Sequence, residues 1–103
     1  MSAVIYVSYP RTEDSTFDID YYLNTHMKIV QQHWGPHGLK SWNVIQFEEG
    51  DPSGMHVQCI MYWESKEAFT KAYALGIPEV HQDLKHYSNT PPVRWVGKNL
   101  LQG

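Results

Sequence analysis

A chain of 103 residues and 12.0 kDa has room for one compact domain. Its 8 Lys and Arg against 11 Asp and Glu give a formal net charge of −3, which excludes a general nucleic-acid binder, because phosphate contacts need clustered basic residues. Hydrophobic residues make up 42% of the chain, so disorder is not expected, and no stretch approaches the roughly 20 apolar residues that cross a membrane.

The first half of the chain reads as a strand followed by a helix. Residues 4–9 are β-branched and aromatic and are followed by Pro10, which predicts a strand. Asp18 is the predicted helix N-cap, and Phe17 and Tyr22 flank the first turn as a hydrophobic staple. The helix is expected to continue to about Trp34.

Two features describe that helix further. Gly35 and Pro36 come directly after Trp34, so they are expected to end it. Spacings of three, four and seven place one set of residues on a common face: Ile19, Tyr22, His26, Ile29, Val30 and His33.

The second half is predicted to contain three strands and two helices. Strands are expected over residues 39–47, 55–63 and 93–100, the first two separated by a turn-rich segment. Ser65 is the predicted cap of a second helix, and Pro78 opens a short third one. The third helix has an apolar face at i, i+4 and i+7: Val80, Leu84 and Tyr87.

The order β-α-β-β-α-(α)-β predicts an α+β fold of the ferredoxin-like, split βαβ type, with one antiparallel sheet and helices on one face. Residues 1–103 form a single domain. Strand alternation assigns the more apolar set to the helix side: Ile5, Val7, Tyr9, Cys59, Met61 and Trp63. The opposite set is mixed but too apolar for bare solvent: Tyr6, Ser8, His56, Gln58, Ile60 and Tyr62. We therefore expect a homodimer whose sheets meet face to face.

Three segments, taken in order, carry a resemblance to a known family. Residues 17–22 read Phe-Asp-Ile-Asp-Tyr-Tyr, with His26 after them, and residues 63–69 read Trp-Glu-Ser-Lys-Glu-Ala-Phe. A third segment extends over residues 83–97, with Tyr-Ser-Asn at 87–89. Together they resemble the EthD-like family, and the likeness covers nearly the whole chain.

The resemblance implies a dimeric α+β barrel. Relatives in fungal aromatic-polyketide pathways are described as tailoring enzymes, such as dehydratases or decarboxylases, and more distant barrels include cofactor-free cyclases, isomerases and monooxygenases as well as haem enzymes. The family's helix histidine is often followed by a proline, whereas Met27 and Lys28 follow His26 here.

His26 and Tyr22 are the candidate catalytic residues. A histidine with an ordinary pKa of about 6.5 can give or take a proton near neutrality, and the resemblance points to the same residue. Tyr22 lies one turn earlier, where it can orient His26 or bind substrate. The alternatives are a core histidine satisfied by a carbonyl or a tyrosine hydroxyl, and a core tyrosine.

An aromatic and methionine lining suits a flat apolar ligand. The expected substrate-binding residues surround one space between sheet and helices: Tyr9, Met61, Trp63, Tyr73 and His81. The alternative for these side chains is plain core packing, and for His81 a solvated position.

No metal and no bound cofactor are expected. The spacings of the six histidines match no ligand set, and no Gly-rich phosphate loop, nucleophile elbow or dinucleotide fingerprint is present. Cys59, the single cysteine, lies within a predicted strand as inert filler. A lone cysteine and the lack of a signal peptide indicate a cytoplasmic protein.

The leading hypothesis is a small cofactor-independent enzyme that acts by acid–base chemistry on an apolar, aromatic or polyketide-like molecule. Dehydration, decarboxylation, isomerisation and cyclisation all fit, so a lyase or isomerase of secondary metabolism is the expected class. One alternative is a non-catalytic protein that binds or delivers a hydrophobic ligand to an oxidase. Another is a bare dimerisation module with a filled core. A cavity of about 300 Å³ or more at His26 would favour the first two.

Overall fold

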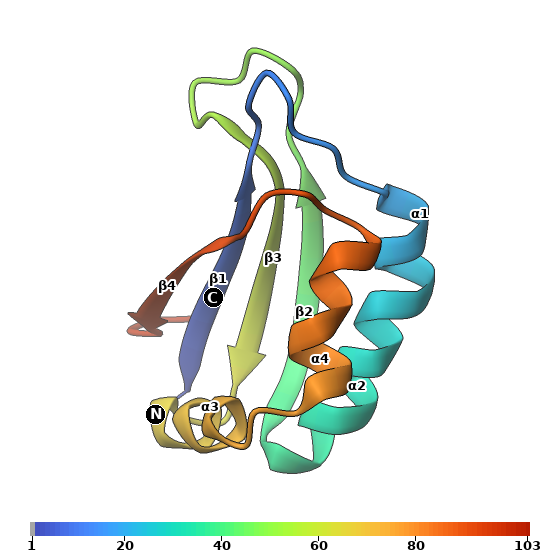
Figure 1. Cartoon of the computed structure of the whole chain (residues 1–103). Helices are drawn as coiled ribbons and strands as arrows, with labels where there is room; N and C mark the ends of the chain where they lie inside the picture. The colour runs from blue at the N-terminus through green and yellow to red at the C-terminus, as the bar shows by residue number, and fades with distance from the viewer. Residues whose placement is uncertain (1) are drawn as a thin grey trace.

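Four antiparallel strands form one sheet in the order β2-β3-β1-β4, and the helices pack on one of its faces (Figure 1). The structure is a computed structural model and describes residues 2–103. The strands are β1 (Ala3–Pro10), β2 (Leu39–Gln46), β3 (Met55–Trp63) and β4 (Val93–Lys98). The helices are α1 (Ile19–Tyr21), α2 (Met27–Trp34), α3 (Lys66–Ala74) and α4 (Pro78–His81). This arrangement confirms the predicted α+β, ferredoxin-like fold.

The strands lie close to where the sequence places them. β3 has the predicted bounds, and β2 ends one residue before the expected end at residue 47. β4 ends at Lys98 rather than at Leu100, because Lys98 pairs with Ala3, the first residue of β1. Beyond that pair the Asn99 N–H still donates a hydrogen bond of 3.3 Å to the Ser2 carbonyl, but Leu100 lies outside the sheet and is exposed.

The first predicted helix is interrupted by a π-helical segment, which the sequence pattern does not reveal. α1 begins after the N-cap Asp18, whose carboxylate accepts a hydrogen bond of 3.0 Å from the Tyr21 backbone N–H. A π-helix follows over Tyr22–His26, and α2 continues from there to Trp34. The predicted staple is confirmed, since the rings of Phe17 and Tyr22 lie 5.0 Å apart.

This helix ends at Trp34, as predicted, but Gly35 is not the residue at which the backbone turns left-handed. Gly35 keeps a right-handed helical conformation and opens a short 3-10 turn over Gly35–His37. Gly38, with a φ of 116°, is the left-handed residue at which the helical conformation ends. An added Cβ there would also lie 3.0 Å from the side chain of Ala68, so both backbone and space favour glycine.

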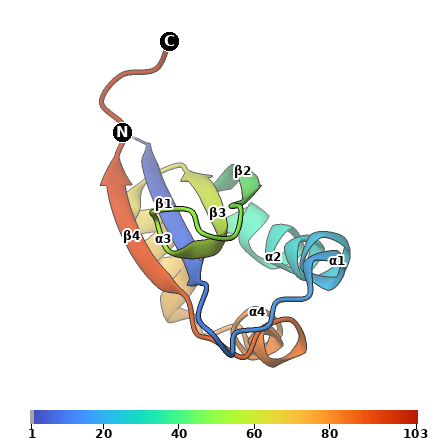
Figure 2. The same ribbon diagram turned by 90° about the horizontal axis from the view of Figure 1, so that it is seen from above.

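The other two helices begin as predicted. The hydroxyl of Ser65 accepts the backbone N–H of Ala68 at 3.0 Å and caps α3. Pro78 is the first residue of α4, which passes into a 3-10 helix over Gln82–His86. α4 packs against α2 across the same face of the sheet (Figures 1 and 2). None of the helices within residues 2–103 is long and apolar enough to cross a bilayer.

The core lies between the sheet and the helices. All six residues assigned to the helix side by alternation are buried, which confirms the predicted face. The opposite face is partly exposed and carries no helix (Figure 2). Its β4 residue Trp95, the neighbour of Tyr6, is 46% exposed.

Candidate active site

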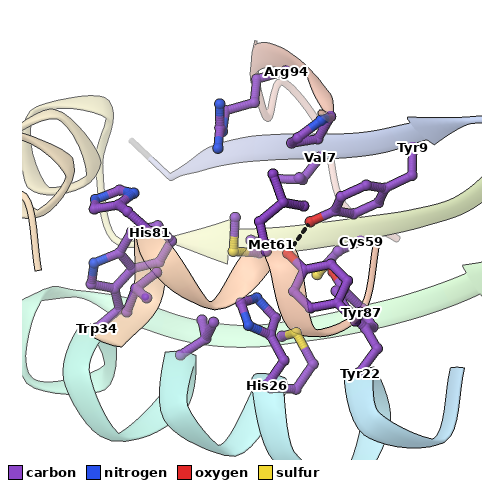
Figure 3. A pocket seen from close by; sticks show the side chains of 15 residues that line it. Val7, Tyr9, Tyr22, His26, Trp34, Cys59, Met61, His81, Tyr87 and Arg94 are labelled. Carbon is purple, nitrogen blue, oxygen red and sulfur yellow. Dashed lines mark hydrogen bonds between the residues drawn. The ribbon is translucent and has the colours of Figure 1, made fainter. Parts of the chain in front are cut away.

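A small cavity lies between the sheet and the helices, and its lining includes Pro92 and Arg94 at the start of β4 (Figure 3). Its volume is about 70 Å³, which is less than the roughly 300 Å³ expected of a small-molecule pocket. The lining is largely apolar and aromatic, with His26, His81 and Arg94 as its nitrogen-bearing exceptions besides Trp34. A ligand of ordinary size therefore fits only partly, unless side chains of the lining move.

The π-helix brings two of the lining residues together. Its hydrogen bond from the Met27 N–H reaches back to the Tyr22 carbonyl, and Tyr22 and His26 both face inward. The two rings are nearly parallel, with centroids 5.1 Å apart. π-helical turns occur often at functional sites, because they re-aim side chains within a helix.

His26 is paired with a buried carboxylate from a different helix. Its Nδ1 lies 2.9 Å from an Asp83 carboxylate oxygen, and both residues are less than 10% exposed. The second oxygen of Asp83 accepts a hydrogen bond of 2.6 Å from the Tyr21 hydroxyl. Asp83 therefore favours the tautomer with hydrogen on Nδ1. Among residues 2–103, Nε2 of His26 has no hydrogen-bond partner.

The pair sets the protonation of His26. Burial lowers the pKa of His26 below its usual 6.5, and the hydrogen bond and charge of Asp83 offset this only in part. The imidazole is thus neutral near pH 7 and its Nε2 can accept a proton. Since its folded-state pKa is lowered, the stabilisation linked to His26 is complete above 6.5 and is lost as the pH falls through the folded value.

Aromatic rings enclose the imidazole. The Tyr87 ring lies 4.5 Å from the imidazole and 4.9 Å from the Tyr22 ring, centroid to centroid, so the three rings form one cluster. The Tyr87 hydroxyl is 2.7 Å from that of Tyr9. Burial raises the pKa of Tyr9 to about 12 and that of Tyr87 further, so both are protonated. Because one hydroxyl hydrogen suffices for their mutual bond, the pair keeps a second one to donate.

The structure brings most of the predicted site residues together and leaves two apart. The lining includes five of them: Tyr9, Tyr22, His26, Met61 and His81. Trp63 lies outside the lining, because it is fully buried at the end of β3 against Trp34 and Phe69. Tyr73 is 39% exposed on α3 and lies below Arg94 rather than in the cavity.

Three residues of the site were not predicted from the sequence as site residues: Asp83, Tyr87 and Arg94. Asp83 could have been predicted, because it lies three residues after Val80 on the helix face that also carries Leu84 and Tyr87. A carboxylate on a buried stripe needs a partner. Arg94 offers no comparable signal, because only the pairing of β4 with β1 places it beside Val7.

Other candidate chemistry can be located as well. Within the described part of the chain, no three His, Cys, Asp or Glu side chains gather as a possible metal-ligand set. Cys59 is buried in β3, and burial raises the pKa of its thiol to about 12. A thiol held protonated in this way is a poor nucleophile.

Comparison with known proteins places the fold. No protein-family model matches this chain, and no curated protein matches it either. Among solved structures, an EthD-like protein from Ralstonia eutropha superposes with a TM-score of 0.86 and 24% identity, covering 99% of this chain and 95% of that one. The fold is that of the EthD-like proteins.

Two further solved structures of similar fold widen the comparison. An ethyl tert-butyl ether degradation (EthD) family protein from Bacillus halodurans has a TM-score of 0.68 at 21% identity, over 97% of this chain and 100% of its own. SnoaB from Streptomyces nogalater, described as a cofactor-independent oxygenase, has a TM-score of 0.61 at 15% identity over 100% of both chains. The resemblance read from the sequence is thus confirmed as a likeness of EthD fold.

Proposed function

We propose that this protein is a small enzyme that uses the His26–Asp83 pair for acid–base chemistry on an apolar, aromatic or polyketide-like molecule, without a bound cofactor. The observation that carries the proposal is the buried pair itself, with Nδ1 of His26 held by Asp83 at 2.9 Å beside a cavity. The SnoaB comparison supports it, because a protein of the same fold is described as a cofactor-independent oxygenase.

The proposed chemistry begins with proton abstraction. Nε2 of neutral His26 accepts a proton from a carbon next to a carbonyl group of the substrate, and Asp83 stabilises the imidazolium that forms. The spare hydroxyl hydrogen of the Tyr9–Tyr87 pair is available to the oxygen on which negative charge develops. Return of the proton to another carbon isomerises the substrate. Attack of the carbanion on a second carbonyl carbon of the same molecule closes a ring, and the proton then goes to the alkoxide oxygen that forms. Cleavage of the bond to a hydroxyl on the neighbouring carbon, with transfer of the proton to that hydroxyl, releases water.

Burial of Asp83 favours this proposal over a structural module. A buried carboxylate costs more desolvation than an apolar residue of the same size would, so packing alone does not explain Asp83. The small cavity volume, taken by itself, fits a nearly filled core. A carboxylate and a histidine placed in such a core therefore support chemistry at the cavity. The substrate would enter when side chains of the lining move.

The test is recovery of the natural ligand. Small molecules that copurify with the wild-type protein and with the His26→Gln variant would be extracted and compared by mass spectrometry. We expect the variant to retain a substrate and the wild type to retain its product. A mass difference of water, of carbon dioxide or of nothing would identify the reaction class, and conversion of the variant's ligand by added wild-type protein would establish turnover. Absence of such conversion would contradict the proposal.

The largely apolar lining also supports a second candidate, a protein that binds or delivers a hydrophobic ligand to an oxidase. The same experiment separates the two candidates. A carrier would hold an identical molecule in the wild type and in the His26→Gln variant, and neither protein would convert it.

We further propose that the protein is a homodimer joined through the open face of the sheet. Ile60 and Tyr62 of β3 are only partly buried there, and Trp95 of β4 is half-exposed. Apolar side chains concentrated on a sheet face without helices are typical of a subunit interface. Sedimentation at micromolar concentration is expected to give about twice the 12.0 kDa of one chain.

The Ile60→Asp variant should sediment as a folded monomer, because a buried carboxylate opposes association. Leu75→Asp, at an exposed residue that follows α3, is the matched control and should stay dimeric. A wild-type protein that sediments as a monomer would overturn the proposed dimer.

A further inference from the structure

Three nitrogen-bearing side chains meet at the end of the cavity opposite the tyrosine pair. Trp34 comes from α2, His81 from α4, and Arg94 from β4 (Figure 3). Figure 3 shows Trp34 and His81 side by side at this end, with Arg94 reaching toward it from above, while Tyr9 and Tyr87 lie at the other end. The chemistry at His26 does not use any of the three.

Two of these side chains have a buried nitrogen without a hydrogen-bond partner. Nε1 of Trp34 is enclosed and unpartnered, and the whole residue is only 4% exposed. Nε2 of His81 is likewise enclosed and has no partner within residues 2–103. Buried nitrogens are paired in the great majority of cases, and an exception calls for an explanation such as a ligand atom.

Arg94 adds a positive charge on an exposed side chain at this end of the cavity. Within the described part of the chain, the only contact of ion-pair length is the one between His26 and Asp83, so no carboxylate neutralises the guanidinium. The guanidinium lies 5.1 Å above the Tyr73 ring. The Tyr73 and His81 rings are 4.7 Å apart, and His81 and Trp34 are 5.9 Å apart. The rings of Tyr73, His81 and Trp34 thus form a continuous row that begins at the Arg94 guanidinium and ends at the buried indole of Trp34.

We propose that this end of the cavity binds a carboxylate group of the substrate, with Arg94 as its counter-ion and the Trp34 indole N–H as a further hydrogen-bond donor. This inference rests on the proposed function, because it names the class of substrate on which His26 acts: an aromatic carboxylic acid.

The donors present favour a carboxylate over a phosphate. A single guanidinium matches the charge and the planar geometry of one carboxylate, whereas a doubly charged phosphate ordinarily needs several cations or a row of backbone N–H groups. Burial and the charge of Arg94 both lower the pKa of His81, so His81 is neutral and adds no second positive charge.

The orientation has a consequence for the reaction. A carboxylate held at Arg94 points away from the Tyr9–Tyr87 end, and the guanidinium stabilises its negative charge. Loss of that carboxylate as carbon dioxide is therefore disfavoured. Elimination of water, isomerisation or cyclisation, at a carbon closer to His26, remains as the reaction of such a substrate.

Binding of benzoate and of benzamide, measured by isothermal titration calorimetry near neutral pH, tests this inference without any turnover. The two probes have nearly the same shape and differ in charge. Benzoate is expected to bind about tenfold more tightly than benzamide. Arg94→Gln should abolish the difference, while Lys98→Gln, which removes a charge from the same strand outside the cavity, should preserve it.

The outcomes distinguish this inference from the proposed function. The His26→Gln variant should still prefer benzoate, since His26 lies outside the carboxylate subsite. Equal affinity for the two probes, no detectable benzoate binding at millimolar concentration, or an unchanged preference in Arg94→Gln would each overturn the subsite. None of these results bears on whether His26 carries out proton transfer, which the extracted ligand tests separately.

Discussion

Replacement of His26 by Gln is expected to reduce kcat by about 10²–10⁴-fold, the usual contribution of a positioned general base. Glutamine preserves a polar, planar side chain that can still donate a hydrogen bond to Asp83, but it cannot take up a proton. The measurement is turnover of the substrate recovered from the variant, with the circular dichroism spectrum as the check on folding. The spectrum should be unchanged, because the substitution is close to isosteric.

A matched histidine controls for non-specific effects of this substitution. His37 is exposed on the 3-10 turn that follows α2 and is not part of the cavity lining. The His37→Gln variant should therefore turn over substrate at the wild-type rate. Wild-type turnover by a folded His26→Gln protein would rule out the assigned role of His26.

Replacement of Trp63 by Ala is expected to lower the free energy of unfolding by about 3–5 kcal/mol, the typical cost of removing a fully buried large aromatic side chain. Trp63 has no exposed surface, and its ring packs 5.4 Å from that of Trp34 and 5.3 Å from that of Phe69. The total free energy of unfolding of a domain of this size is about 5–15 kcal/mol. Urea unfolding of the variant and the wild type at equal protein concentration measures the difference.

Trp63→Phe is the matched variant. It keeps an aromatic ring and removes the indole N–H, which is buried without a hydrogen-bond partner within residues 2–103, so it should cost less than the alanine variant. If Trp63→Ala weakened ligand binding while the free energy of unfolding stayed within about 1 kcal/mol of the wild type, Trp63 would be a binding residue, as first expected, and not a core residue.

The fold could be predicted from the sequence because its signals are local. Pro10, the turn-rich segment before Met55 and the caps Asp18 and Ser65 mark where elements begin or end, and the period of two assigns the sides of the sheet. The π-helix over Tyr22–His26 could not be predicted, since it preserves the helical appearance of the sequence. The end of β4 depends on where β1 begins, which is a tertiary property.

The site could be predicted in part, for the same reason. The helical stripe that carries Tyr22 and His26, and the strand alternation that carries Tyr9 and Met61, both converge on the cavity. The partner of His26 comes from a helix 57 residues later, and no local pattern reports such a pairing. Trp63 has the same strand alternation as Met61 but does not line the cavity, because it lies at the end of β3 and packs against Trp34.

The pH dependence of kcat/KM for the recovered substrate, in the wild type and in Asp83→Asn, tests the His26–Asp83 assignment most directly. Because burial lowers the pKa of His26 and Asp83 partly offsets this effect, wild-type kcat/KM should rise with pH through a value below 6.5 and then level off. In Asp83→Asn the rise should move to lower pH, and the plateau should fall, because the carboxylate no longer fixes the tautomer. A rise at the same pH in both proteins, or a wild-type profile without any ionisation below 6.5, would contradict the assignment.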